Sequence, residues 1–278
     1  MHPERKVLVM IPALNEERSI GKVIDEVPWI KLLELGFRTE ILVVDGKSVD
    51  RTMEIARERG VKTITQKGGK GKGIGVRQAF SLSHPQQVVI NALNLKMDVE
   101  AGLNAMTSFL DADYIVMLDG DGTYPASYIY DMVISLESGN DVVMGSRLQG
   151  KIEPGSMSSL NLLGNLILSG IASILYLRHV SDLCTGLWGF RTSSLRLLSL
   201  DSLAFELEAE MFAEAVKNGL KIDEVPISYL AREGESKLVP LKSGAMILVK
   251  LMERRVFTAN RNIDWVEQET RSGSPSFP

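Results

Sequence analysis

Short apolar runs rich in β-branched residues recur through the first half of the chain. They lie at residues 7–11, 41–44, 61–65, 114–118 and 141–145. Between several of these runs, at residues 19–27 and 51–59, apolar side chains recur every three to four positions, which is typical of amphipathic helices. This alternation predicts an α/β fold in which a mostly parallel sheet carries helices on both faces.

Three polar motifs directly follow predicted strands. They occupy residues 12–16, 45–52 and 119–125. In an open sheet of parallel strands, ligands bind beyond the carboxyl ends of the strands. We therefore expect the three motifs to meet at one edge of the sheet and to form the functional site there.

One segment of the second half approaches the length of a membrane span. Residues 160–177 are apolar except for a few positions, of which Asn161, Asn165 and Ser169 recur every four residues and would form one polar stripe on a helix. Such a helix is about 27 Å long, just short of a hydrocarbon core of about 30 Å. The pattern favours a packed or interfacial helix over one that spans a bilayer.

A further helix is predicted at about residues 241–255. Its apolar side chains share one face, and Lys250, Arg254 and Arg255 add basic charge. This pattern fits a helix that lies on a membrane surface. It fits equally well an ordinary amphipathic helix packed on the protein core.

The chain of 278 residues is expected to divide into three parts. They are a main α/β domain over residues 1–240, a region of amphipathic helix over residues 241–269, and a disordered tail rich in Ser, Pro and Gly over residues 270–278. The first predicted strand begins at residue 7, which leaves no room for a signal peptide. We therefore expect a cytoplasmic protein.

The composition limits the possible partners. Hydrophobic residues make up 45% of the chain and charged residues 24%, as in an ordinary globular protein. The net charge of -4 argues against nucleic acid as a partner. The single cysteine, Cys184, permits no intrachain disulfide, which suits a reducing compartment, and its apolar surroundings favour a small core residue over a nucleophile.

The triplet Asp119-Gly120-Asp121 is a candidate metal site. Two carboxylates separated by a small residue can share a divalent cation, and Mg²⁺ or Mn²⁺ prefers oxygen ligands completed by water and substrate phosphates. A bound cation would offset the charge of a leaving group. A plain turn is the alternative interpretation, because Asp and Gly also favour turns.

Two further motifs could hold a nucleotide. Asp45 is placed to bind a base or ribose, whereas Asp50 or Ser48 could instead cap the helix that follows. The segment 67–73 combines glycines with three lysines, which suits a diphosphate, although a mobile basic loop is the alternative. The segment lacks the spacing of a P-loop, which disfavours a kinase or NTPase.

Together these motifs resemble family 2 glycosyltransferases of the GT-A fold over about residues 6–241. The motifs that carry the resemblance are residues 11–16, 43–45 with 48–52, 70–73, 119–121, 145–147, and 185–186 with 189–191. Residues 224–227, followed by Arg232, Gly234 and residues 236–238, are similar to the dolichyl-phosphate mannose synthase group. The chain also resembles archaeal enzymes that charge dolichyl phosphate at the start of N-glycan assembly.

The resemblance implies a role for individual residues. Binding of the nucleotide sugar is implied for Pro12, Ala13, Asn15, Glu16, Asp45, Lys72, Asp119, Gly120 and Ser236, and binding of Mg²⁺ or Mn²⁺ for Asp119 and Asp121. Catalytic contacts with the donor diphosphate or the acceptor phosphate are implied for Asp121, Arg147, Arg191, Arg232 and Lys237. The acceptor would be dolichyl or polyprenyl phosphate, and the enzyme would be peripheral on the cytoplasmic face of the membrane.

The chain departs from the pattern of this group in three places. Gly46 follows Asp45 where the synthases have a second acid, and Thr123 stands where they have a metal-ligating Gln. The third protein ligand of the metal is therefore not identified. Residues 86–106 look like an insertion.

The acceptor decides which chemistry the site must supply. A phosphate monoester is already largely ionised near neutral pH, since its second pKa is about 6, so a lipid phosphate needs no protein base and would attack with inversion at the anomeric carbon. A hydroxyl acceptor, such as phosphoglycerate in a soluble transferase, would need a carboxylate base. Glu208 and Glu210 are the candidates, unless they belong to a solvated helix face.

Two other classes of function compete with a transferase of this kind. A nucleotidyltransferase should show a Gly-rich segment directly after its first strand, where this chain has residues 12–16 with the sequence PALNE. That observation disfavours it. A nucleotide-sugar-binding regulator would bind the donor without hydrolysing it.

Overall fold

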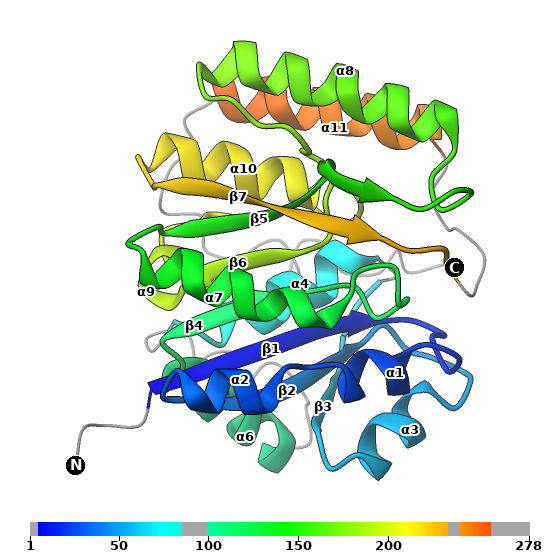
Figure 1. The fold of residues 1–278 in the computed structure, drawn as a ribbon, viewed down its shortest axis with the longest axis vertical. Coiled ribbons are helices and arrows are strands. Elements are labelled where there is room, and N and C mark those ends of the chain that lie inside the picture. Colours follow the sequence, from blue (N-terminus) through cyan, green and yellow to red (C-terminus); the bar gives the residue numbers. More distant parts are fainter. Residues whose placement is uncertain (1–4, 70, 85–98, 233–239, 257–278) are drawn as a thin grey trace, which may run out of the picture.

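The computed structural model describes residues 5–69, 71–84, 99–232 and 240–256 (Figure 1). Within these residues, seven strands form one sheet: β1 (Arg5–Ala13), β2 (Phe37–Asp45), β3 (Lys62–Thr65), β4 (Tyr114–Met117), β5 (Val142–Ile152), β6 (Trp188–Arg191) and β7 (Ile222–Tyr229). Their order is β3-β2-β1-β4-β6-β5-β7. All neighbouring pairs are parallel except those of β6, which runs antiparallel to both β4 and β5.

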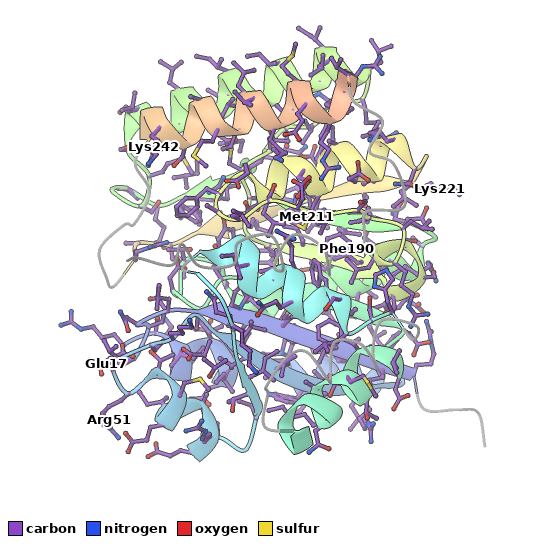
Figure 2. All side chains as sticks on the ribbon, turned by 180° about the vertical axis from the view of Figure 1, so that it is seen from behind. Glu17, Arg51, Phe190, Met211, Lys221 and Lys242 are labelled. Carbon is purple, nitrogen blue, oxygen red and sulfur yellow. The ribbon has the colours of Figure 1, made fainter. Side chains whose placement is uncertain are left out.

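The helices lie on both faces of the sheet, as the sequence predicts. Their bounds are α1 (Ile20–Asp25), α2 (Trp29–Glu34), α3 (Thr52–Glu58), α4 (Lys72–Ser81), α6 (Val99–Leu110), α7 (Ile129–Glu137), α8 (Ser159–Tyr176), α9 (Thr192–Leu195), α10 (Leu207–Lys217) and α11 (Pro240–Val256), with a short 3₁₀ turn at Ala126–Tyr128. Figure 1 shows α1, α2 and α7 in front of the sheet, and Figure 2 shows α4, α6 and α10 on the other side.

Each sheet face has its own apolar core because side chains alternate along a strand. On β1, Leu8 and Met10 join the core beneath α4, α6 and α10. Val7, Val9 and Ile11 point the other way, into the core beneath α1, α2 and α7. The predicted strands and helices of the first half are thus confirmed, with strands β1, β2 and β5 longer than their apolar runs.

Helices α8 and α11 lie side by side beyond α10, at the end of the molecule nearest β7 (Figure 1). The hydroxyl of Tyr176 on α8 donates to the carbonyl of Leu251 on α11 at 2.8 Å. Asn165 and Ser169 of the predicted polar stripe are buried. Among the described residues, α8 is the one helix whose length and composition would allow it to cross a membrane.

Some expectations from the sequence fall partly outside the described residues. Of the apparent insertion at 86–106, residues 99–106 belong to α6, whose Ser108 accepts a hydrogen bond from Lys62 of β3 at 2.9 Å. Residues 257–278, with the predicted tail, lie outside the description. The boundaries proposed for the main domain and the C-terminal region stay predictions, although α11 does begin at residue 240.

Candidate active site

The loops that follow β1, β2 and β4 meet at the carboxyl edge of the sheet, as predicted. The amide of Gly46 donates to the carbonyl of Ala13 at 2.8 Å, and the amide of Gly120 donates to the carbonyl of Pro12 at 3.2 Å. Gly120 packs tightly against the first loop, because an added Cβ would lie 3.2 Å from Ala13 Cβ and would require that residue to shift. The backbone contacts of Pro12, Ala13 and Gly120 therefore hold these loops together beneath the polar side chains.

The loops after β1 and β2 hold each other through side-chain caps. Asn15 has a φ of 53°. Its side-chain oxygen accepts from the amide of Val49 at 2.9 Å, and its own amide donates to the hydroxyl oxygen of Ser48 at 2.9 Å. The hydroxyl of Thr52 accepts from the amide of Glu16 at 2.8 Å. Asn15 and Ser48 thus fix the backbone of the site.

Asp45 and Asp50 have the contacts of loop-forming carboxylates. Asp45 is 3% exposed and accepts from the amides of Lys47 and Ser48 at 3.2 and 3.0 Å. Asp50 accepts from the amide of Thr52 at 3.0 Å, at the start of α3. Hydrogen bonds from Thr52 outweigh the effect of partial burial and lower the pKa of Asp50. Asp50 thus has a structural contact at the helix start, although the N-cap of α3 is Arg51, which makes no side-chain cap hydrogen bond, and a ligand contact by Asp45 stays a prediction.

The centre of the site is an ammonium held between two carboxylates. Lys72, the first residue of α4, places its Nζ 2.6 Å from Asp119 Oδ1 and 2.7 Å from Glu208 Oε1 of α10. Burial alone would lower the pKa of Lys72, but the two carboxylates outweigh it and raise the pKa above its ordinary value. Lys72 is therefore a fixed positive charge beside Asp119.

A second cation faces the other acid of the triplet. Arg232, directly after β7, forms an ion pair with Asp121, which is 4% exposed. Asp121 also accepts from the hydroxyl of Thr123 at 2.6 Å. Burial disfavours the charge of Arg232, yet the carboxylates around it, Asp121 first and Glu16 among the others, raise its pKa. Glu16 therefore lies within electrostatic range of Arg232.

Gly186 lets Asp119 reach its position. A Cβ at Gly186 would collide with Oδ2 of Asp119, so a larger residue here would push Asp119 out of its position. The amide of Gly186 donates to the hydroxyl of Tyr124 at 2.7 Å. The motif at residues 185–186 was visible in the sequence, but its contact with Asp119 was not, because the two lie far apart along the chain.

Arg147 lies in an internal ion pair near the site. Its Nε and Nη2 donate to the two oxygens of Asp182 at 2.7 Å each, and its guanidinium carbon lies 5.0 Å from the centre of the Tyr229 ring. Asn165 of α8 donates to Asp182 at 2.6 Å. Arg147 is 7% exposed, so its described contacts anchor the loop that carries Gly186. Sequence reasoning missed Asp182 because no motif marks it.

Arg191 lies at the opposite edge of the sheet, which corrects its expected place in the site. It pairs in register with Tyr114, the first residue of β4, whereas Asp119 follows the last. Its Nη2 donates to the carbonyl of Leu136 at 3.0 Å, and its amide donates to Asp141. In Figure 2, Lys221, whose amide also bonds Asp141, lies on the side of the molecule opposite Glu17. Arg191 cannot contact a ligand held by Asp119.

The two candidate bases have different surroundings. Glu208 is buried beside Lys72. Glu210 is fully buried, paired with Arg254, and accepts from the amides of Asp201 and Ser202. Neither belongs to a solvated helix face, so that alternative is wrong, and the contacts of Glu210 give it a structural role.

Three other residues were singled out from the sequence. Ser236 and Lys237 lie outside the described residues. Cys184 is half-buried on the rim of an apolar core, and burial raises the pKa of its thiol to about 12, so it carries no thiolate at neutral pH. This agrees with a packing role.

The donor set at Asp119 and Asp121 fits a small oxygen-loving cation. Mg²⁺ is usually bound by one or two carboxylates, with substrate phosphates and water as its other ligands, and this turn offers two. Within residues 5–69, 71–84, 99–232 and 240–256, no three His, Cys, Asp or Glu side chains form a cluster that could hold a metal by themselves. A metal at this turn would thus depend on a bound phosphate for part of its shell.

The mixed sheet with helices on both faces, and with acids and cations gathered at the carboxyl ends of its strands, has the GT-A architecture expected from the sequence. The chain belongs to glycosyl transferase family 2, whose model matches residues 8–92 and 93–198.

Relatives from archaea cover most of the chain. Glycosyltransferase AglJ of Haloferax volcanii is 31% identical over 250 residues, which are 89% of this chain and 71% of that protein. A dolichyl-phosphate hexose transferase of the same organism is 33% identical over 239 residues, 86% of this chain and 89% of that one. A solved bacterial structure shares the fold. It is glucosyl-3-phosphoglycerate synthase from Mycobacterium tuberculosis in complex with Mn²⁺, UDP and glucosyl-3-phosphoglycerate. The match has a TM-score of 0.60 at 20% identity and covers 90% of this chain and 80% of that one.

Proposed function

We propose that the protein transfers a hexose from a nucleoside-diphosphate sugar, UDP- or GDP-linked, to dolichyl or polyprenyl phosphate, for glycan assembly such as protein N-glycosylation. The observation that carries this proposal is the cluster at the sheet edge, where Lys72 and Arg232 stand against Asp119 and Asp121. Two fixed cations beside a two-carboxylate metal turn suit the phosphates of a donor and an acceptor. The name of the archaeal hexose transferase supports the choice of lipid phosphate.

In this proposal the loops after β1 and β2 hold the nucleoside, and the turn at residues 119–121 holds the diphosphate. Asp45 and Asn15 keep the nucleoside loop in shape through their hydrogen bonds to backbone amides. Mg²⁺ or Mn²⁺, held by Asp119 and Asp121, would neutralise charge that develops on the departing diphosphate. Lys72 supplies a fixed ammonium on the same side, already oriented by Asp119 and Glu208.

The acceptor phosphate requires orientation rather than a base. Its oxygens are largely ionised near neutral pH, because the second phosphate pKa is about 6. Arg232 can grip such a group through two N–H donors and align one oxygen with the anomeric carbon. The new C–O bond forms on the face opposite the C–O bond that breaks, the bonding pair leaves with the diphosphate, and the configuration inverts.

A hydroxyl acceptor such as phosphoglycerate is the second candidate. It would need a general base, and Glu208 is a buried carboxylate whose contact with Lys72 is shared by Asp119 of the turn at residues 119–121. In the described structure, however, Glu208 is engaged with that ammonium. The lipid-phosphate reaction needs no base and can leave the pair of Glu208 and Lys72 intact, which is why we prefer it.

One assay decides between the two acceptors. The protein and Mn²⁺ or Mg²⁺ are incubated with UDP- or GDP-hexoses and either polyprenyl phosphate in detergent or 3-phosphoglycerate, and the products are weighed by mass spectrometry. We expect a polyprenyl phosphate heavier by one hexose and no glycosylated phosphoglycerate. A product from phosphoglycerate alone would reverse the assignment of the acceptor.

We further propose that the enzyme works as a peripheral protein on the cytoplasmic face of a membrane, with α8 and α11 against the lipid. These two helices expose large apolar side chains, namely Leu160, Leu163, Leu166, Ile167, Ile174 and Leu177 from α8 and its end, and Met246, Leu248, Val249, Met252 and Val256 from α11. Lys242 and Arg255 are exposed on α11, and Arg178 follows α8. Apolar area flanked by basic charge suits a bilayer with anionic headgroups.

We predict that the variant Leu163→Glu/Val249→Glu loses membrane binding. Burying a Leu or Val side chain contributes about 1.5–3 kcal/mol, so the partition of the variant into vesicles should fall by at least about tenfold. The measurement is flotation with vesicles of phosphatidylserine and phosphatidylcholine, with Leu33→Glu on α2 as an equally exposed control. High salt or carbonate should release the parent. Retention through a carbonate wash would contradict peripheral attachment, and unchanged flotation of the double variant would contradict the assigned face.

A further inference from the structure

Helix α11 has a buried arginine on its inner side, opposite the exposed apolar residues. Arg254 is 3% exposed and forms an ion pair with the fully buried Glu210 of α10. Its Nη2 also lies 2.8 Å from Asp201 Oδ2, and Lys250 binds the other oxygen of Asp201 at 2.7 Å. Burial opposes the charge of Arg254, but the carboxylates of Glu210 and Asp201 outweigh it and raise its pKa.

Glu210 uses its remaining hydrogen-bonding capacity on the backbone of the turn at residues 201–204. Its carboxylate accepts from the amides of Asp201 and Ser202 at 3.0 and 2.9 Å. Glu206, one turn earlier on the chain, accepts from the amides of Leu203 and Ala204 at 2.8 and 3.1 Å. Two buried carboxylates thus fix all four amides of this turn.

The turn at residues 201–204 in turn supports the glycines beside Lys72. A Cβ at Gly73 would lie 2.6 Å from the carbonyl oxygen of Ser202, and one at Gly71, whose φ is 148°, would collide with the carbonyl oxygen of Leu203. The two backbones are therefore in direct contact, with no side chain between them. Whatever moves the turn must move the start of α4.

We propose that Arg254 and Glu210 are positioning residues for the donor site. They fix the turn at residues 201–204, the turn supports Gly71 and Gly73, and these glycines set Lys72 between Asp119 and Glu208. The effect on donor binding rests on the proposed function, since it requires that Lys72 binds the donor. The helix whose outer face is assigned to the bilayer then controls, through its inner face, the geometry of the nucleotide-sugar site.

Amide hydrogen exchange tests the positioning without any ligand. In Arg254→Met, we expect the amides of residues 71–76 and 201–204 to exchange at least about tenfold faster than in the parent, because Glu210 loses its partner. Arg255→Met is the matched control, since it removes an exposed charge from the next position of α11. Parent-like exchange of residues 71–76 in Arg254→Met would overturn the proposal.

A double variant separates positioning from stability. Glu210→Met/Arg254→Met leaves no unpaired buried charge, and replacing a buried ion pair by apolar residues is often neutral for stability, so the variant should still unfold cooperatively. We expect it to bind UDP or GDP with Mn²⁺ at least about tenfold more weakly by calorimetry, and Arg254→Lys to recover part of that affinity. Parent-like affinity and exchange in a double variant of lowered Tm would show a purely structural role.

The outcomes for the donor site and for the positioning are distinct. A parent protein that binds neither UDP nor GDP would refute Lys72 as a donor-binding residue and, with it, the proposed function. The exchange rates of residues 71–76 would still decide whether Arg254 and Glu210 position the start of α4.

Discussion

Asp121→Asn is expected to lower turnover by at least about a hundredfold and to leave the fold intact. The substitution keeps the oxygen that accepts from the amide and the hydroxyl of Thr123 at 3.0 and 2.6 Å, so the turn should keep its shape. It removes the negative charge that binds Arg232 and that would hold the metal. Electrostatic stabilisation of a leaving group accounts for losses of this size when one group is removed.

The measurement is hexose transfer at saturating donor, together with circular dichroism for the fold. Asp111→Asn is the matched control, because Asp111 is exposed and precedes β4, at the edge of the sheet opposite Asp121. EDTA should abolish the activity of the parent, and Mn²⁺ or Mg²⁺ should restore it. Near-normal turnover of Asp121→Asn, or full activity in EDTA, would remove the metal from the mechanism.

The sequence was sufficient to predict the layered fold and the edge that carries the site. Alternating apolar runs and helical spacings are local signals, and parallel strands bring their carboxyl ends together by geometry. Asp45, Asp119 and Asp121 could therefore be placed at one edge before any contact was known. Lys72 of the glycine-rich loop was expected to bind the nucleotide sugar, but its 2.6 Å contact with Asp119 was not predicted.

Arg191 was misplaced because the direction of β6 has no local signature. The apolar pattern of a short strand is the same for a parallel and an antiparallel neighbour, so only the tertiary structure decides the direction in which the strand runs. Since β6 is antiparallel to β4, its last residue lies at the start of β4 and not at its end. Arg147 lies toward the carboxyl edge of the sheet, the edge that carries Asp119. The reason is that β5 is antiparallel to β6 and therefore runs in the same direction as β4.

Long-range contacts could not be predicted either, because they join residues that no spacing relates. Glu208 and Glu210 look alike in the sequence, two positions apart on one helix. Only the packing of α4 and α11 on α10 gives them different partners. Glu208 contacts Lys72 of α4, and Glu210 contacts Arg254 of α11. The chemistry available to each carboxylate is thus a property of the tertiary structure.

Arg232→Lys is expected to lower transfer to polyprenyl phosphate by about 10- to 100-fold. A guanidinium grips phosphate with two parallel N–H donors, whereas an ammonium offers a point charge. Losing one hydrogen bond to a charged group costs about 1.5–3 kcal/mol, and about 1.4 kcal/mol corresponds to a factor of ten. Binding of the nucleotide should survive in part, because Lys72 and the loop around Asp45 are untouched.

Arg191→Lys provides the comparison that makes this test specific to the acceptor site. It is the same chemical change at the opposite edge of the sheet, where Arg191 bonds the carbonyl of Leu136, so transfer should stay near the parent rate. The measurements are initial rates with varied polyprenyl phosphate, and calorimetry with UDP or GDP for the nucleotide. If Arg232→Lys transfers hexose to polyprenyl phosphate as fast as Arg191→Lys and the parent do, Arg232 does not hold the acceptor phosphate. The assignment of a lipid phosphate to this edge then loses its support, while membership of the transferase family is unaffected.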